Sequence, residues 1–176
     1  MEKKHKFILI IGSDGAGTST IAKGLNQYFG YPVEHHGPVK SHEEGYKEYF
    51  GDVERIDYSV IKDRFHEGER IYAPLYRGYE AEYFPELEKE IMKKFDPLLV
   101  LLQPPLQTVL DRIAVRGEDF VKPEHIEYCY DKITDIFNDS ILPKIVIDTS
   151  RNHSIDNVKK IVKRIMWGLH IFLFYV

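Results

Sequence analysis

Short apolar runs alternate along this chain with longer segments in which apolar residues recur every three or four positions. The short runs have the length and β-branched content of buried strands, and the longer segments have the period of helices packed on one face. Strands and helices that alternate in this way form a parallel sheet with helices on both faces. The sequence therefore predicts an α/β fold with strands over residues 6–11, 33–36, 58–62, 98–102 and 144–148.

Start and stop signals place most of the helices. The first helix is expected from Thr18 to Phe29, with Gly30 ending it. Ser41 has the pattern of an N-cap, and Glu44 three residues later predicts a capping box. Residues 63–79 mix charged and aromatic side chains and are assigned no element. Further helices are expected over residues 82–95, from about 105, from 123 to about 138, and from 154 to 168.

The helical period also predicts which side chains of the first and last helices face the core. Ile21, Leu25 and Tyr28 share one stripe of the first helix. Ile155 and Val158 belong to the apolar stripe of the last helix. A stripe of this kind is buried when a helix packs on a sheet, so we expect these side chains to face the interior.

Length and charge set limits on the class of protein. The chain has 176 residues, of which 43% are hydrophobic, and this suits a single domain over residues 1–176. Its formal net charge is −4, so no general attraction to nucleic acid or to an anionic membrane is expected, and no long nucleic-acid track. The single cysteine, Cys129, excludes an internal disulfide and a cysteine-based zinc cluster.

Two apolar segments near the ends of the chain are too short to be targeting or membrane segments. The run over residues 7–11 follows basic residues but ends in a glycine-containing turn, so we interpret it as a buried strand of a cytoplasmic protein. Residues 167–176 are strongly apolar but fall short of the ~20 residues that a membrane helix needs. We expect the fold or a second subunit to cover this segment, which predicts a homodimer.

The turn after the first apolar run has the pattern of a phosphate-binding loop. Gly12, Gly17 and Ser19 match G-x-x-x-x-G-K-[ST], whereas Thr18 stands where that pattern has lysine. Backbone N–H groups and a following helix N-terminus attract an anion without any side-chain charge, and Ser19 can offer its hydroxyl to Mg²⁺. The alternative is a strand-to-helix turn without a ligand. The loop consists of Gly12, Ser13, Asp14, Gly15, Ala16, Gly17, Thr18, Ser19 and Thr20.

Polar residues also follow the second and third predicted strands. In open α/β sheets, ligands bind beyond the carboxyl ends of the strands. Asp63 can hold Mg²⁺ through water there, and Arg64 can bind phosphate as a planar fork. His35 and His36 follow the second strand. The alternatives are a solvated Asp-Arg pair and loop histidines without a function.

A second basic cluster lies further along the chain. Arg112 and Arg116 are four residues apart, so they share one face of a helix and can converge on a polyphosphate. Gly117 could hinge this segment as a lid. A helix that carries solvated arginines is the alternative.

These motifs occur together in a characteristic order. The loop is followed by Asp63-Arg64 and an aromatic residue, then by Tyr76-Arg77-Gly78, then by R-x-x-x-R-G from Arg112. In this order the chain resembles thymidylate kinase and its relatives among nucleoside and nucleotide kinases, from Lys6 to about Ser150. Residues 63–78 are most similar to the thymidylate kinase-like P-loop proteins of bacteriophages. The resemblance implies a three-layer P-loop NTPase fold with five parallel strands in the order 2-3-1-4-5.

The resemblance also implies roles for the site residues. The loop would bind the phosphates of ATP, and Asp63 would organise Mg²⁺ together with Ser19. Arg64 would act near the acceptor phosphate. Two catalytic arginines, Arg112 and Arg116, would belong to a lid over about residues 112–122. The residues in contact with the acceptor would be His36, Tyr72, Tyr76 and Arg77. The alternatives for these residues are simple aromatic packing or no function.

The expected activity is Mg²⁺-dependent transfer of the γ-phosphoryl group of ATP to a deoxynucleoside monophosphate, with a dTMP-like acceptor favoured, in deoxynucleotide metabolism. Because Thr18 replaces the lysine, the alternative is a nucleotide-binding sensor or interaction protein with impaired catalysis. A further alternative is a kinase that acts on a nucleoside or on a modified base in DNA. Three lysines are candidates for the missing charge, and Lys62 is favoured because it adjoins Asp63. The other two are Lys23 and Lys40.

Overall fold

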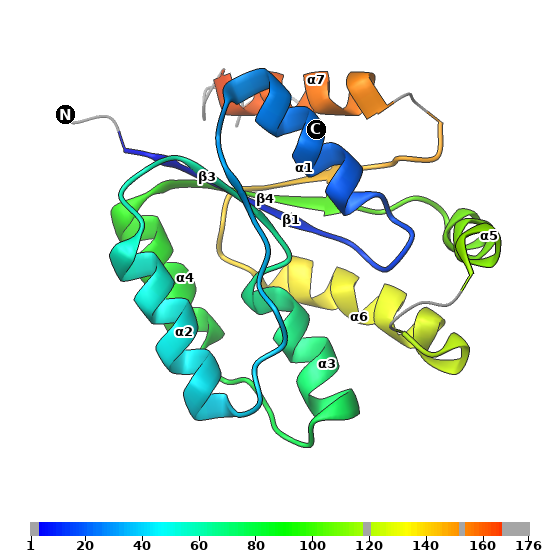
Figure 1. Ribbon diagram of the computed structural model, residues 1–176, viewed down its shortest axis with the longest axis horizontal. Coiled ribbons are helices and arrows are strands. Elements are labelled where there is room, and N and C mark those ends of the chain that lie inside the picture. Colours follow the sequence, from blue (N-terminus) through cyan, green and yellow to red (C-terminus); the bar gives the residue numbers. More distant parts are fainter. Residues whose placement is uncertain (1–3, 118–120, 152–153, 167–176) are drawn as a thin grey trace, which may run out of the picture.

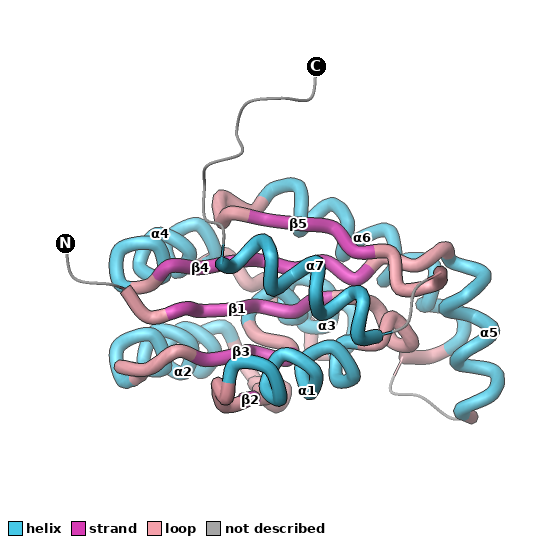
Figure 2. Tube along the Cα trace, turned by 90° about the horizontal axis from the view of Figure 1, so that it is seen from above, coloured by secondary structure: helices cyan, strands magenta, loops and turns pink. Residues whose placement is uncertain are grey.

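Five parallel strands form the central sheet. The computed structural model describes residues 4–117, 121–151 and 154–166. Figure 2 shows the strands side by side, in the order β2-β3-β1-β4-β5. This confirms the predicted fold class and strand order. The strands are β1 (Lys6–Ile11), β2 (Val33–Glu34), β3 (Val60–Asp63), β4 (Asp96–Leu102) and β5 (Lys144–Ile147).

Helices cover both faces of this sheet (Figure 1). Helices α1 and α7 lie on one face, and α2, α3, α4 and α6 lie on the other, whereas α5 lies beyond the carboxyl ends of the strands. The helices are α1 (Thr18–Phe29), α2 (His42–Arg55), α3 (Glu69–Tyr76), α4 (Phe84–Lys94), α5 (Leu106–Arg116), α6 (Ile126–Asp139) and α7 (Ser154–Met166). Two 3₁₀ turns, η1 (His66–Gly68) and η2 (Pro123–His125), precede α3 and α6.

Each face of the sheet has its own hydrophobic cluster. Along β1, Ile8 and Ile10 pack with α1 and α7, whereas Phe7 and Leu9 pack with the helices on the opposite face. Successive side chains of a strand point to opposite faces, so a strand buried on both sides has apolar residues at every position. The same alternation at the end of β3 decides where its charged residues point.

The predicted helix ends are mostly confirmed. Helix α1 ends at Gly30, which takes a φ of 73° in the left-handed region that favours glycine. The Oγ of Ser41 accepts a hydrogen bond from the Glu44 N–H at 3.2 Å, as expected of an N-cap. The Glu44 carboxylate accepts from the Lys40 N–H at 2.5 Å. It reaches one residue further back than in the predicted capping box.

Several expectations about the helices were wrong or incomplete. Residues 66–76, to which no element was assigned, form η1 and α3. Tyr28 and Ile155 are 60% and 62% exposed and do not face the core. The reason is that α1 and α7 also pack on each other, and the Val158 side chain would lie 2.6 Å from a Cβ at Gly24. This close contact turns Tyr28 and Ile155 toward an outer groove between the two helices.

Some expectations concern residues that are not described. These are residues 118–120 of the expected lid, and the apolar segment 167–176, so the homodimer stays a prediction. Among the described residues, no helix has both the length and the apolar character to cross a membrane.

The close packing of Gly12 gives a testable prediction. A Cβ at this residue would lie 2.8 Å from the Ala16 Cβ and 2.9 Å from the Leu102 carbonyl oxygen. Gly12→Ala should therefore lower the free energy of unfolding by about 1–3 kcal/mol, measured by urea denaturation. Gly51→Ala is the control, because Gly51 is in α2 with open space at its Cβ position, and should gain about 0.5–1 kcal/mol. Equal stability of the two variants would contradict the packing described here.

Candidate functional site

The loop over residues 12–20 turns sharply between β1 and α1. Gly15 and Gly17 have φ values of 82° and 97°, a region that glycine enters without steric cost. Gly17 is the N-cap of α1, and no side chain among the described residues caps the first N–H groups of this helix. A twelve-residue helix with open N–H groups at its first turn favours an anion there, because the helix dipole adds to the hydrogen-bond donors.

Thr18 does not extend from the loop as a lysine would. It is buried, and its Cγ2 lies 3.3 Å from the position that a Cβ on Gly12 would occupy. The threonine side chain therefore fills space within the loop. The loop itself has no side-chain cation. A side-chain cation that contacts a bound phosphate group therefore has to come from another element.

Ser19 and Asp63 form a pair between the loop and the end of β3. The Ser19 Oγ donates a hydrogen bond to the Asp63 Oδ2 at 2.8 Å. The Asp63 side chain is buried, and its Oδ1 has no hydrogen-bond partner among the described residues. A hydroxyl beside a carboxylate with a free oxygen fits the oxygen ligands that Mg²⁺ prefers. The structure thus brings together the two predicted metal-site residues.

Arg64 contacts the loop from the next position of the chain. Its Nη2 donates to the Asp14 Oδ1 at 2.6 Å, while its backbone N–H donates to the Ile10 carbonyl at 3.3 Å. Among the described residues, Arg64 is the one non-glycine residue with a positive φ, at 67°. This left-handed conformation costs an arginine roughly 1–2 kcal/mol, so the surrounding contacts hold it in place.

Arg112 lies against the loop from α5. Its Nη1 donates to the Gly15 carbonyl at 3.0 Å and to the Thr149 Oγ1 at 3.1 Å, and its Nη2 donates to the Thr149 carbonyl at 2.8 Å. These bonds connect α5, the loop and the residues after β5. Arg116 is exposed at the last residue of α5. Since residues 118–120 are not described, the lid remains a prediction.

A cavity of about 390 Å³ lies where Arg112 meets the loop and the start of α7. It is lined by loop residues, by Arg112 and Thr149, and by Ser154 and Asn157. Asn157 is 1% exposed, and its Oδ1 has no partner in the described part of the chain. The apolar stripe predicted for α7 did not include Asn157, because this residue is polar. It lies next to Val158 on the inward face of the helix.

A second cavity, of about 250 Å³, opens beside Arg64, and we call it the aromatic cavity. It brings together three of the four predicted acceptor residues: His36, Tyr72 and Arg77. Tyr76 does not line it; its hydroxyl lies 3.0 Å from the Nδ1 of His125, the last residue of η2. The residues lining this cavity are His35, His36, Gly37, Pro38, Tyr49, Arg64, Phe65, Gly68, Glu69, Tyr72 and Arg77.

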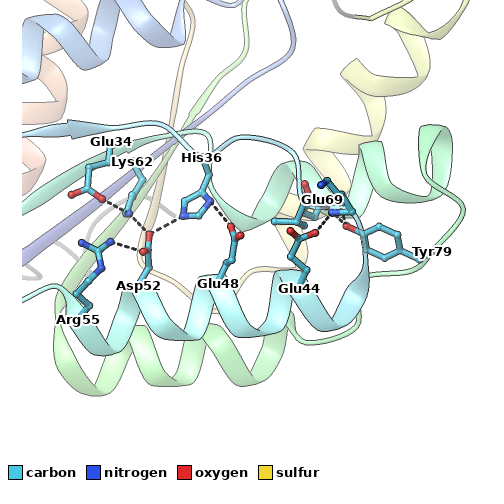
Figure 3. Close-up of polar contacts among 11 residues, drawn as sticks. Glu34, His36, Glu44, Glu48, Asp52, Arg55, Lys62, Glu69 and Tyr79 are labelled. Atoms are coloured by element: carbon cyan, nitrogen blue, oxygen red, sulfur yellow. Dashed lines mark hydrogen bonds and ion pairs between the residues drawn. The ribbon is translucent and has the colours of Figure 1, made fainter.

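Glu69 is a residue of this cavity that the sequence analysis missed. Its Oε2 accepts hydrogen bonds from Arg77 Nη2 at 2.7 Å and from the Tyr79 hydroxyl at 2.5 Å (Figure 3). Burial together with the bond to Glu69 raises the pKa of Tyr79 to about 12. The Arg77 Nε is buried and has no partner among the described residues. Recognising α3 as a helix would have placed Glu69 beside Tyr72, three residues on.

The structure contradicts the expectation that Lys62 serves the loop. Its side chain is fully buried, and its Nζ lies 2.6 Å from Glu34 Oε2 and 2.7 Å from Asp52 Oδ2 (Figure 3). Because adjacent residues of a strand point to opposite faces, Asp63 faces the loop and Lys62 faces α2. Of the other candidates, Lys23 lines the groove between α1 and α7, and Lys40 is exposed.

Asp52 connects this buried lysine to the aromatic cavity. Its Oδ2 also lies 2.8 Å from the Nε2 of His36, and its Oδ1 accepts from Arg55 at 2.6 Å. Burial alone would raise the pKa of the Asp52 carboxyl, but the bonds from His36, Lys62 and Arg55 outweigh burial and hold that pKa well below its ordinary value. Asp52 is therefore a carboxylate that keeps His36 in the cavity wall.

Comparisons with known proteins show the fold. No family model and no curated protein match the sequence. YorR from Bacillus subtilis, solved in complex with phosphorylated GDP, is 21% identical with a TM-score of 0.77, over 89% of this chain and 93% of that one. Deoxyadenosine kinase from M. mycoides, solved with dCMP and a flexible dCDP, is 17% identical with a TM-score of 0.60, over 89% and 96%.

Kinases of other small molecules share the fold as well. A gluconokinase from Sinorhizobium meliloti is 11% identical with a TM-score of 0.57, over 96% of this chain and 100% of that one. The chain therefore has the α/β fold of the P-loop kinases. The likenesses span several kinase classes and do not single out thymidylate kinases.

The buried lysine gives a prediction about stability. Lys62→Met leaves Glu34 and Asp52 without their shared cation, so it should lower the free energy of unfolding at pH 7 by about 3–5 kcal/mol. Lys93→Met is the control, because Lys93 pairs with Glu90 on an exposed surface, and it should change stability by about 0.5 kcal/mol or less. Urea denaturation of both variants measures the difference.

The pH dependence of that loss tests its cause. Folding lowers the pKa of Asp52, so its pairing with Lys62 stabilises the protein above pH ~3.9, which is the ordinary pKa of the unfolded side chain. This stabilisation disappears as the pH falls further. The gap between Lys62→Met and the unaltered protein should therefore narrow below pH ~4. A gap that stays constant down to pH ~2 would mean that lost packing, rather than lost charge pairing, is responsible.

Proposed function

We propose that this protein is a P-loop kinase that transfers the γ-phosphoryl group of ATP to a deoxynucleoside monophosphate in the presence of Mg²⁺. The observation that carries the proposal is the position of Arg64. This side chain bonds to Asp14 of the loop and also lines the aromatic cavity. A loop that fits phosphate and a cavity that fits a nucleobase therefore meet at one guanidinium group.

The residues around the loop suit ATP and Mg²⁺. The N–H groups of the loop and of the first turn of α1 would bind the phosphates. Ser19 and Asp63 would hold Mg²⁺, which neutralises phosphate charge when bound. The cavity beside Arg112 and Asn157 lies at the back of the loop and would take the nucleoside part of ATP, whose edge can hydrogen-bond to the Asn157 amide.

The aromatic cavity suits a nucleobase better than a sugar acid. Tyr72 is half-buried and supplies a ring surface on which a base can stack, and the buried rings of Tyr49 and Phe65 add apolar lining. Arg77 Nε has no hydrogen-bond partner among the described residues and lies near the carboxylate of Glu69, and the edge of a base presents an acceptor next to a donor. These features favour a nucleotide over acceptors such as gluconate. The preference for a dTMP-like base rests on the sequence resemblance.

The residues of the site would act mainly by positioning and by neutralising charge. Phosphoryl transfer needs an in-line approach of the acceptor oxygen and stabilisation of charge on the transferred group, and it needs no covalent intermediate. Arg64 lines the aromatic cavity and bonds to the loop, so such a group would pass close to it. Arg112 would keep the loop in shape, because it binds the Gly15 carbonyl.

A second candidate function follows from one observation. Thr18 is buried within the loop and supplies no charge, so a nucleotide-binding sensor or interaction protein with impaired catalysis is the alternative. A nucleoside or a modified base in DNA remains a further alternative as acceptor. Turnover distinguishes a kinase from a sensor or interaction protein. The choice of acceptor distinguishes a deoxynucleoside monophosphate kinase from a kinase of nucleosides or of modified bases in DNA.

The test is a coupled ADP-release assay with ATP, Mg²⁺ and a panel of deoxynucleoside monophosphates and nucleosides, run on this protein and on Thr18→Lys. We expect turnover by the unaltered protein, fastest with a dTMP-like acceptor. Activity in Thr18→Lys alone would support the impaired-kinase alternative. ATP binding without turnover in either protein would support the sensor.

The Glu69 contact gives a prediction about the acceptor. Glu69→Gln removes a buried charge that orients Arg77, so the KM for the acceptor should rise roughly 10- to 100-fold while the KM for ATP stays within a factor of about three. Glu90→Gln, on the exposed face of α4, is the matched control and should change neither KM. Equal increases in both KM values would argue against a role of Glu69 in acceptor binding.

A further inference from the structure

The loop lacks a side-chain cation, yet two guanidinium groups contact it. Arg112 reaches it from α5, and Arg64 reaches it from the end of β3. Both Nη atoms of Arg112 donate to the Gly15 carbonyl or to Thr149, so these donors are directed at protein oxygens. Arg112 thus stabilises the loop through its backbone.

Arg64 differs from Arg112 in its partners. Within the described residues its guanidinium has Asp14 as its one hydrogen-bond partner, and its side chain is 39% exposed. An arginine has five N–H donors in a planar fork, so donors remain for a phosphate group. Arg64 also lines the aromatic cavity, and this places its charge on the side of the loop that faces an acceptor.

The surroundings hold Arg64 in this position. Its left-handed backbone, with φ at 67°, turns the chain at the end of β3, and the Asp14 carboxylate binds the guanidinium from the loop. The Asp14 side chain is only 4% exposed, so the carboxylate lies behind the more exposed guanidinium. The strained backbone of Arg64 and the buried carboxylate of Asp14 both position one guanidinium group.

We propose that Arg64, at the end of β3, supplies the positive charge that neutralises the terminal phosphate of ATP. In the pattern G-x-x-x-x-G-K-[ST], a lysine of the loop supplies this charge. Thr18 is then tolerated because the charge comes from a neighbouring strand. This inference rests on the proposed function, since it requires ATP in the loop. It adds that Arg64 contacts the donor as well as the acceptor phosphate.

A comparison of ATP and ADP binding tests the inference without any need for turnover. The two nucleotides differ by the γ-phosphate, so the ratio of their Kd values, measured by calorimetry with Mg²⁺, reports contacts to that group. Arg64→Gln should lower the preference for ATP by about tenfold or more. Thr18→Lys should restore about tenfold or more in the Arg64→Gln background, but change the unaltered protein by only about threefold or less.

Arg70→Gln is the matched control. Arg70 also pairs with one aspartate, Asp139 at 3.1 Å, and its side chain is 30% exposed, but it lies away from the loop on α3. It should leave the preference for ATP unchanged. Arg64→Lys keeps the charge and should retain the preference within about threefold, which separates lost charge from disturbed folding if Arg64→Gln is unstable.

The outcomes distinguish this inference from the proposed function. Thr18→Lys effects that are equal in both backgrounds would overturn the inference, because independent sites add. An unchanged ATP preference in Arg64→Gln would overturn it as well, while leaving the kinase proposal intact. If the unaltered protein binds neither ATP nor ADP, the proposed function fails and the inference fails with it.

Discussion

The site depends on the end of β3, where three consecutive charged residues go to three different environments. Lys62 is buried against α2, Asp63 bonds to Ser19, and Arg64 bonds to Asp14. The strand alternation separates the first two, and the left-handed backbone at Arg64 turns the third back to the loop. Three charges next to one another in the sequence would repel or pair locally in a flexible segment. Here each charged residue has its own partner, and together the three residues connect the loop, the aromatic cavity and α2.

Charge pairing below the surface supports the aromatic cavity. Lys62 holds Glu34 and Asp52, and Asp52 holds His36 in the cavity wall. On the other side of the cavity, Glu69 fixes Arg77 and Tyr79. Buried charges are costly unless they are paired, so such networks contribute more to a defined geometry than to stability. Under the proposed function, walls that are fixed in this way help the cavity to select one small molecule.

The loop lacks a lysine, so the proposed activity requires a side-chain cation from another element. A phosphate group responds to the positive potential at its position and not to the chain segment that provides it. The fold brings the end of β3 and the loop together, so a guanidinium at residue 64 and an ammonium at residue 18 can act on the same region. The structural neighbours include a deoxyadenosine kinase and a gluconokinase, so the same fold occurs in kinases with different substrates.

The sequence by itself determined the alternation of strands and helices, the loop, and the placement of Ser19 and Asp63 at one edge of the sheet, because these follow from local periods and from the rule that parallel strands end at one edge. It failed where contacts between distant segments decide. Helix α3 was missed because its polar and aromatic residues are buried in a shared cavity, and Tyr28 and Ile155 were misplaced because α1 and α7 pack on each other at Gly24. Lys62 and Glu69 resemble solvated surface residues in the sequence. Only the tertiary structure buried them, because their partners, Asp52 and Arg77, come from other elements or from beyond the helix.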